Sequence, residues 1–403
     1  MASTSLHLGV ALDGAGWHPA AWREPNSRPT ELFAPSYWTD LVATAERGLL
    51  DFVSIEDTLT APTERHLRAD DAVDRVRARI DAHLIAARVA PVTSGIGLIP
   101  TITTTHTEPF HVSKALATLD YTSRGRAGWQ VRISGTADEA AHFGRREVHS
   151  PADEEIANVL AGGDLPAGVL ELFDEAQDVI EVVRRLWDSW EDGAEIRDVA
   201  TRRFIDRDKL HYIDFEGRFF DVRGPSITPR PPQGQPVVAA LAHQRVPYEL
   251  AARGGDLVFV TPSVDGPQTV LDDVAGALAR TGREGEPLRV YADLVVFLDT
   301  SQEPGASRLD RLNTLDGREF HSDAAVFTGS AETLADLLTD WRGLGFDGFR
   351  LRPGVAVDDL ATISDTLVPI LQRRGLFRTA YPDLPLRGLL GLPTDVPNRY
   401  ATV

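Results

Sequence analysis

Residues 94–134 read SGIGLIPTITTTHTEPFHVSKALATLDYTSRGRAGWQVRIS. The stretch opens with a short apolar run at 94–99 and ends with a second one at 129–133. Between them, residues 110–121 have helical spacing and follow Pro109, a residue favoured at the first position of a helix. A strand, a helix and a strand in this order predict a parallel βαβ unit, because parallel strands need a crossover connection.

The same alternation extends outward from this unit in both directions. Further short apolar runs predict strands at 6–12, 51–55, 237–241, 257–260, 288–297 and 348–351. Segments with helical spacing predict helices at 35–48, 80–90, 172–190, 247–253, 268–281, 331–343 and 357–374. Eight units of strand and helix predict a closed (β/α)8 TIM barrel, with residues 1–403 as one domain.

The competing fold is an open, doubly wound sheet. Its nucleotide-binding form carries G-x-G-x-x-G after the first strand, whereas residues 13–19 read DGAGWHP and supply only the first two glycines. Long insertions interrupt the predicted units at 13–35, 57–79, 134–171, 191–235 and 299–330. Within them, alternation around EGR predicts a small hairpin over 202–223. Because loops after barrel strands build active sites, we expect some insertions to shape a pocket and others to pack outside.

Composition narrows the classes of function. Of 403 residues, 42% are apolar and 25% are charged, as in a soluble globular protein. Acidic residues outnumber basic ones 60 to 41, and the net charge of −19 argues against nucleic acid as a partner. The lack of cysteine excludes thiolate metal sites and cysteine nucleophiles. No apolar run reaches the ~20 residues that cross a bilayer, and the first residues lack a basic signal region, which predicts a cytoplasmic protein.

Polar side chains gather where the predicted strands end. In a barrel these ends converge on one face, where we expect Asp57, Thr101, Thr103, Thr104, Thr105, His106, Gln130, Ser134, His243, Gln244 and Arg245. The sequence has no G-x-S-x-G, no phosphate-binding P-loop and no helical histidine pair for a metal. Hydroxyls and amides suit the orientation of a cofactor that brings its own chemistry. The plainer alternative is that the threonines end a strand and Asp57 caps a loop or a helix.

One stretch of the chain resembles a known family motif. Residues 119–134, followed by Phe143 and Gly144, resemble LDHLSxGRxxWNxVTS…FG of the bacterial luciferase-like flavin-dependent monooxygenases, in the nitrilotriacetate and dibenzothiophene-sulfone monooxygenase branch. Residues 46–52 resemble ERGxFD, and residues 97–110 resemble GLxxTxST…PY. Later signatures of the branch are matched at 186–192, 215–237 and 369–392, so that the resemblance runs from about residue 8 to residue 392.

This resemblance implies a barrel that receives reduced FMN (FMNH2) from a separate flavin reductase. With molecular oxygen, such a protein oxygenates a small organic substrate through a flavin 4a-hydroperoxide. The matched motifs place four residues beside the flavin ring: Asp57, Thr103, Thr104 and Gln130, the last in place of an asparagine. No catalytic residue is identified. We expect the wall of the substrate pocket to include Trp17, His18, Trp22, His106 and His243, whose rings could alternatively pack the first insertion.

The phosphate side departs from the family motif. Val169, Leu172 and Phe173 stand where the motif has histidine, arginine and tyrosine, and Gln244 stands at a phosphate-binding serine. Because a buried phosphate needs donors, we expect Arg245, or else His243, to supply one. These departures leave two other functions open. One is a flavin-poor, non-catalytic subunit that supports an active homologue, and the other is a deazaflavin-dependent oxidoreductase.

The end of the chain, residues 376–403, forms an apolar arm broken by prolines. An apolar segment of this kind is rarely left exposed to water, so the arm either covers a neighbouring molecule or wraps its own barrel. The family resemblance implies dimers or tetramers, and we therefore expect a homo-oligomer.

Overall fold

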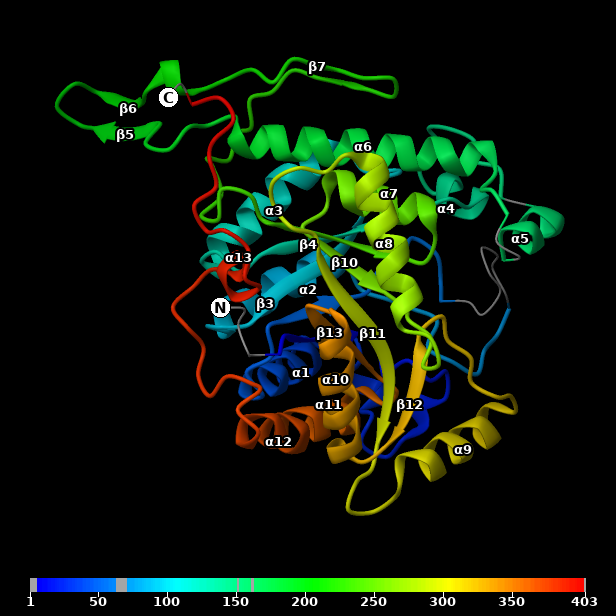
Figure 1. The fold of residues 1–403 in the computed structure, drawn as a ribbon. Helices are drawn as coiled ribbons and strands as arrows, with labels where there is room; N and C mark the ends of the chain where they lie inside the picture. The colour runs from blue at the N-terminus through cyan, green and yellow to red at the C-terminus, as the bar shows by residue number, and fades with distance from the viewer. Residues whose placement is uncertain (1–5, 63–70, 151, 161–162, 402–403) are drawn as a thin grey trace.

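The computed structural model describes residues 6–62, 71–150, 152–160 and 163–401. Eight parallel strands close into a barrel in the order β1–β2–β3–β4–β9–β10–β11–β13, and β13 pairs with β1 to complete it (Figure 1). They are β1 (Leu8–Leu12), β2 (Phe52–Ile55), β3 (Gly97–Thr103), β4 (Gly128–Arg132), β9 (Val237–Ala242), β10 (Leu257–Val260), β11 (Arg289–Leu298) and β13 (Gly348–Pro353). The predicted (β/α)8 barrel is confirmed, and each predicted strand corresponds to one of these eight.

Helices follow the strands and cover the outside of the barrel. They are α1 (Pro35–Arg47), α2 (Ala82–Val89), α3 (Pro109–Ser123), α6 (Ala167–Asp188), α7 (Arg245–Gly254), α8 (Gln268–Thr281), α10 (Ala331–Leu344), α11 (Ala356–Thr362) and α12 (Val368–Arg373). The apolar stripe of α6, with Val179 and Val183, packs on Val112 and Leu116 of α3. None of the helices in the described ranges has the length and apolar character needed to span a membrane.

A ninth parallel strand was missed in the sequence. β12 (Ala325–Gly329) lies in the segment 299–330 that was interpreted as an insertion, after the helix α9 (Gly305–Asp316). It pairs with the second half of β11, beyond the point where β10 stops pairing with the first half. All five residues of β12 are only partly buried, although residues 324–327 (AAVF) form a short apolar run of the kind that predicts a strand.

The remaining insertions form small elements at the carboxyl ends of the barrel strands and along α6. These are α4 (Ala137–Ala141), α5 (Asp153–Leu160), the hairpin β5 (Glu195–Asp198) with β6 (Arg203–Ile205), and the hairpin β7 (Phe215–Glu216) with β8 (Asp221–Val222). The hairpin predicted around residues 216–218 is present as β7–β8, although it is shorter than the predicted range 202–223, and the separate hairpin β5–β6 was not predicted. Both project away from the barrel (Figure 1). Residues 63–70 of the predicted insertion 57–79 lie outside the described residues.

The C-terminal arm closes the end of the barrel at which the strands begin. Around the short helix α13 (Leu386–Leu389), the side chains of Leu386, Leu390 and Leu392 are buried in one apolar cluster with Phe52 and other residues of the barrel interior. The end of the arm then reaches the end of α6, where Asn398 Nδ2 donates to the backbone oxygen of Asp188 at 2.8 Å. Residues 376–403 were expected either to cover a neighbouring molecule or to wrap their own barrel. The described part of this arm packs on its own barrel.

Candidate active site

The barrel interior becomes charged toward the carboxyl ends of its strands. Arg350 on β13 has a side chain that is 1% exposed, and its Nε donates to Asp293 Oδ1 on β11 at 2.8 Å. Its Nη1 donates to Gln130 Oε1 at 2.6 Å and to Glu56 Oε1 at 3.1 Å. The guanidinium carbon lies 3.8 Å from the centroid of the Phe259 ring. Because these groups satisfy one another, they form a polar floor beneath the mouth of the barrel.

A second arginine continues this network into the mouth. Arg352 Nε donates to Asp293 Oδ2 at 2.9 Å, and its Nη1 donates to Asp323 Oδ1 at 2.6 Å. Asp323 Oδ2 in turn lies 3.4 Å from His243 Nε2, and His243 Nδ1 lies 2.8 Å from Thr261 Oγ1. Burial lowers the pKa of His243. A neutral ring whose Nδ1 accepts from the Thr261 hydroxyl fits this geometry.

A cavity of about 1020 Å³ opens above this network. Its walls come from the loops after β1, β2, β9 and β10, and from residues between the end of α9 and β12; the loop after β2 contributes Pro62, Arg75, Val76, Ala78 and Arg79. Four of the five residues predicted for a substrate pocket line it, namely Trp17, His18, Trp22 and His243. The predicted cofactor residue Gln244 lines it as well. His106, the fifth predicted pocket residue, lies elsewhere and stacks on Phe143 with ring centroids 5.0 Å apart.

Two of these aromatic residues also hold the first insertion in place. His18 uses both ring nitrogens, since Nε2 lies 3.1 Å from Asn313 Oδ1 and Nδ1 accepts from the backbone of Ala20 at 3.0 Å. Trp22 Nε1 donates to the backbone oxygen of Asp74 at 2.9 Å. The alternative in which these rings pack the first insertion therefore applies to His18 and Trp22, although both still border the cavity.

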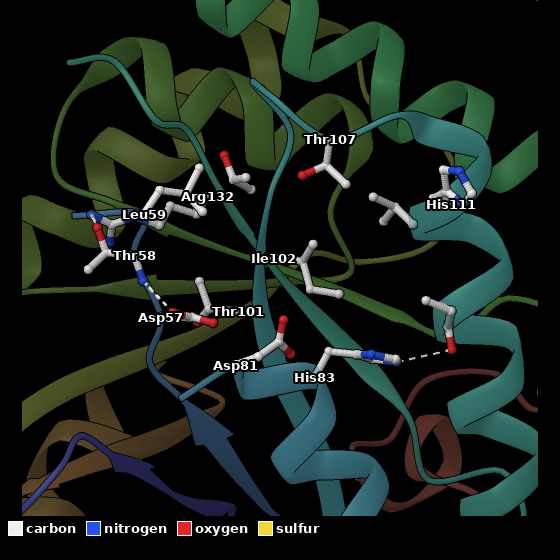
Figure 2. A pocket seen from close by; sticks show the side chains of 13 residues that line it. Asp57, Thr58, Leu59, Asp81, His83, Thr101, Ile102, Thr107, His111 and Arg132 are labelled. Atoms are coloured by element: carbon white, nitrogen blue, oxygen red, sulfur yellow. Dashed lines mark hydrogen bonds between the residues drawn. The ribbon is translucent and has the colours of Figure 1, made fainter. Parts of the chain in front are cut away.

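A second, smaller pocket of about 230 Å³ lies in a gap of the barrel wall (Figure 2). β2 stops pairing with β3 at Ile55 and Pro100, while β3 continues to Thr103 and pairs there only with β4. The pocket fills the space beside this free edge, between the start of α2 and α3. It is lined by Asp57, Thr58, Leu59, Asp81, His83, Thr101, Ile102, Thr103, Thr107, His111, Val112, Ala115 and Arg132.

Asp57 has the structural role that was considered as its alternative. Its Oδ2 accepts from the backbone N–H of Ala82, at the start of α2, at 2.9 Å, and its Oδ1 accepts from the backbone N–H of Thr58 at 2.8 Å. The carboxylate therefore caps a helix and a loop, and it also lines the smaller pocket. Burial raises the pKa of Asp57, even though both hydrogen bonds stabilise its charged form.

Of the other three residues predicted to lie beside the flavin ring, one lines the smaller pocket and two do not. Thr103 lines the smaller pocket, and its hydroxyl donates to Ser134 Oγ at 3.0 Å. The hydroxyl of Thr104 is directed to the backbone oxygen of Arg132 at 3.1 Å. The Gln130 amide lies in the polar floor and is 3% exposed. Thus Asp57 and Thr103 reach the pocket, whereas Thr104 and Gln130 are engaged inside the protein.

Two further residues line the same pocket: Thr101, which the sequence placed only among the strand ends, and Arg132, which it did not single out. Thr101 is 2% exposed, and its Oγ1 has no hydrogen-bond partner. Arg132 donates from Nη2 to Thr58 Oγ1 at 3.2 Å, but its buried Nε also has no partner. The signal for Arg132 was present in the sequence, because the family motif WNxVTS has valine at this position and the chain has arginine.

The residues matched to the phosphate side offer no donor near α6. Leu172 is buried opposite Gly135, and Phe173 packs against the core between α3 and α6. Gln244 Nε2 donates to the backbone oxygen of Val159 at 3.2 Å. Arg245 is 59% exposed and lies among carboxylates, 3.4 Å from Asp164. The expectation that Arg245 holds a phosphate therefore gains no support from its surroundings.

A different arginine lies beside this part of α6. Arg146 Nη2 donates to the backbone oxygen of Thr105 at 2.9 Å and to Glu175 Oε2, one turn after Leu172, at 2.7 Å. The nearby His106 is 9% exposed, and its Nε2 is buried without a partner. Burial, with a smaller contribution from the charge of Arg146, lowers the pKa of His106.

Comparisons with known proteins agree with this architecture. Residues 17–348 match the family described as luciferase-like monooxygenase. N-acetyl-S-(2-succino)cysteine monooxygenase of Bacillus subtilis (strain 168) is 28% identical, and the alignment covers 98% of each chain. Nitrilotriacetate monooxygenase component A of Aminobacter aminovorans is 29% identical over 97% of each chain. A crystal structure of a long-chain alkane monooxygenase has the same fold, with a TM-score of 0.83 at 23% identity over 97% of this chain and 96% of that chain. The chain belongs to the luciferase-like monooxygenase family.

Proposed function

We propose that this chain is the oxygenase component of a two-component, FMN-dependent monooxygenase. A separate flavin reductase supplies reduced FMN, and one atom of molecular oxygen is transferred to a small organic substrate. The observation that carries the proposal is the pair of cavities at the carboxyl ends of the barrel strands, in a chain that matches a monooxygenase family over residues 17–348. A barrel of this kind builds its active site at that end.

The smaller pocket suits the flavin ring. Thr101 and Arg132 line it, and each has a buried polar atom without a hydrogen-bond partner. Asp57 and Thr103 border the same space. Reduced FMN, when bound, supplies the reaction with oxygen, and the protein supplies binding, orientation and exclusion of water.

For the phosphate of FMN, we propose Arg146 and His106 in place of the residues that the family motif would use. Arg146 lies beside Glu175 on α6, close to the position of the missing motif arginine at Leu172. The unpartnered Nε2 of His106 supplies a second donor when that nitrogen carries its proton. A guanidinium can hold phosphate through two parallel hydrogen bonds.

The large cavity suits the substrate. Trp17, Trp22 and Phe320 give it apolar faces, while His243 and Asp323 supply a polar end. We expect a substrate with an apolar body and at least one polar group. His243 is placed to orient that group, because its ring lies at the wall, shares a hydrogen bond with Thr261 and lies 3.4 Å from Asp323 Oδ2.

We further propose a cytoplasmic protein, since the reductase that delivers reduced FMN draws on the nicotinamide pool of the cell. The expected homo-oligomer is retained as a proposal that does not involve the buried leucines of the C-terminal arm. Its interface must lie elsewhere on the surface.

The proposal is tested by mixing the purified chain with reduced FMN without oxygen and then admitting air. We expect the bound flavin to reoxidise more slowly than free reduced FMN, because the protein shields it from water. Reoxidation at the rate of free flavin would contradict the proposal. Failure to bind any flavin would favour the non-catalytic subunit, whose motive is the lack of donors at Val169, Leu172 and Phe173.

A further inference from the structure

The carboxylate of Asp316, in the wall of the large cavity, has an oxygen without a hydrogen-bond partner. The side chain is 5% exposed, and its Oδ1 is buried and accepts no hydrogen bond. Two arginines stand just beyond hydrogen-bond distance, with Arg75 Nη2 3.6 Å from Oδ1 and Arg318 Nε 3.9 Å from Oδ2. A buried carboxylate oxygen without a donor is unfavourable, so its position calls for one.

The place of Asp316 in the chain makes this carboxylate still less favourable for folding. Asp316 is the last residue of α9, and the carbonyl groups at that end of a helix carry a partial negative charge. A basic side chain would stabilise the helix there, whereas an acidic one does not. The two arginines offset part of the negative charge but leave the acceptor open. A bound ligand with N–H groups would supply the donor that the protein lacks.

The described wall of the cavity carries more carboxylates than arginines. The carboxylates are Asp13, Asp316, Glu319 and Asp323, and the arginines are Arg75, Arg79 and Arg318. Arg79 Nε already donates to Asp13 Oδ1 at 3.0 Å, and Arg75 Nε donates to Asp74 Oδ1 at 3.1 Å. An anionic ligand would therefore meet fixed carboxylates and guanidinium groups that are already paired, whereas a cationic ligand would be attracted.

The polar floor beneath the cavity has the same imbalance. Its two arginines share three carboxylates, since Arg350 and Arg352 pair with Asp293, Glu56 and Asp323. Of these carboxylates, Asp323 lines the large cavity, and its side chain is 44% exposed. His243 beside it adds no positive charge at neutral pH, because burial lowers the pKa of its ring. The floor is therefore net negative where it borders the cavity.

We propose that the substrate of this chain is an organic amine, protonated at neutral pH, whose ammonium group donates to Asp316. The inference rests on the proposed function and names the class of substrate for the same cavity. Trp17, Trp22 and Phe320 provide apolar faces for the body of the amine, and His243 can orient a second polar group. Because a protonated nitrogen has no lone pair, the ammonium group serves recognition, and oxygen is transferred to another atom of the substrate.

The test compares three probes that share one aromatic body and differ in one group. At neutral pH phenethylamine is a cation, phenethyl alcohol is neutral and hydrocinnamate is an anion. Isothermal titration calorimetry of the full chain, without flavin, measures a dissociation constant for each. We expect the amine to bind roughly ten- to a hundredfold more tightly than the alcohol, the scale of a hydrogen bond to a charged group. Hydrocinnamate should bind more weakly than the alcohol, because the carboxylates of the wall repel it.

Variants of Asp316 show whether this carboxylate is the acceptor. Asp316→Asn should remove most of the preference for the amine while changing the affinity for the alcohol by less than about threefold. Asp316→Glu should retain part of the preference because the charge remains. Asp310→Asn is the matched control, since it makes the same change at an exposed position of α9 outside the cavity wall, and it should change none of the constants.

The inference is wrong if the wild type shows no preference for the amine, or if folded Asp316→Asn keeps the wild-type preference. Because no flavin is present, either result is independent of the experiment with reduced FMN that tests the proposed function. Far-ultraviolet circular dichroism establishes that each variant is folded. If Asp316→Asn is not, Asp316→Glu gives the second measurement, and an unchanged preference there together with none in the wild type's favour over the alcohol would equally overturn the inference.

Discussion

Replacing Arg350 by methionine removes the centre of the polar floor while keeping a long side chain. Arg350 is 1% exposed and bonds to Asp293, Gln130, Glu56 and Ser54. Breaking a buried ion pair by removing one partner costs about 3–5 kcal/mol. Asp293 keeps its bonds to Arg352, so we expect the lower end, about 3 kcal/mol of lost unfolding free energy.

Chemical denaturation followed by circular dichroism measures this loss as a shift of the midpoint at an unchanged slope. Arg47→Met is the matched control, because Arg47 pairs with Asp365 on the surface, where both side chains are more than half exposed. Such a pair contributes about 0–1 kcal/mol. A loss for Arg350→Met below about 1 kcal/mol, or equal to that of the control, would refute the view that these charges hold the barrel together.

Three further predictions concern the phosphate, the arm and the response to acid. Arg146→Ala should weaken binding of FMN roughly ten- to a hundredfold and leave binding of riboflavin unaffected, whereas Arg245→Ala should change neither affinity by more than about threefold. Calorimetric titration with both ligands measures these affinities. The reverse pattern would restore Arg245 as the phosphate ligand. Truncation after Arg374 should abolish folding, because it removes Leu386, Leu390 and Leu392 from the apolar cluster inside the barrel. A folded, shortened chain with fewer copies per oligomer would instead assign the arm to an interface. Burial raises the pKa of Asp323, but the charge of Arg352 outweighs burial and lowers the pKa to about 2. The ionised carboxylate therefore stabilises the fold at pH values above its ordinary pKa of 3.8, and this contribution is lost as the pH falls toward 2. Acid unfolding of Asp323→Asn should be less steep than that of the wild type in this window, and identical curves would contradict the assignment.

The barrel was predictable because each of its strands is a short buried apolar run followed by an amphipathic helix. The strand β12 was not predicted, because its apolar run (residues 324–327) is short and its place depends on pairing with β11 where β10 ends. The hairpin β5–β6 was not predicted for a similar reason, since none of its strand residues is buried, whereas the hairpin β7–β8 lies around residues 216–218 as predicted. Patterns of apolar residues identify strands and helices that face the core. They do not identify a strand whose position depends on pairing with the free edge of another strand.

The sequence predicted which strand ends carry the site residues, but it did not predict what each residue contacts. Trp17, Trp22 and His243 do border one cavity, because parallel strands bring their carboxyl ends together. Gln130 turns into the floor because Arg350 and Glu56, far away in the sequence, offer it partners. The roles of Arg132 and Arg146 could not be predicted from the sequence. Whether a guanidinium has a carboxylate beside it depends on contacts between distant segments of the chain.

The central claim is that this chain works on reduced FMN held at the mouth of its barrel. An anaerobic titration of the wild-type chain with reduced FMN, followed by flavin fluorescence or equilibrium dialysis, tests it most directly. We predict saturation at one reduced FMN per chain, with tighter binding than for oxidised FMN under the same conditions. No saturable binding of reduced FMN, at concentrations where the protein remains folded, would contradict the claim.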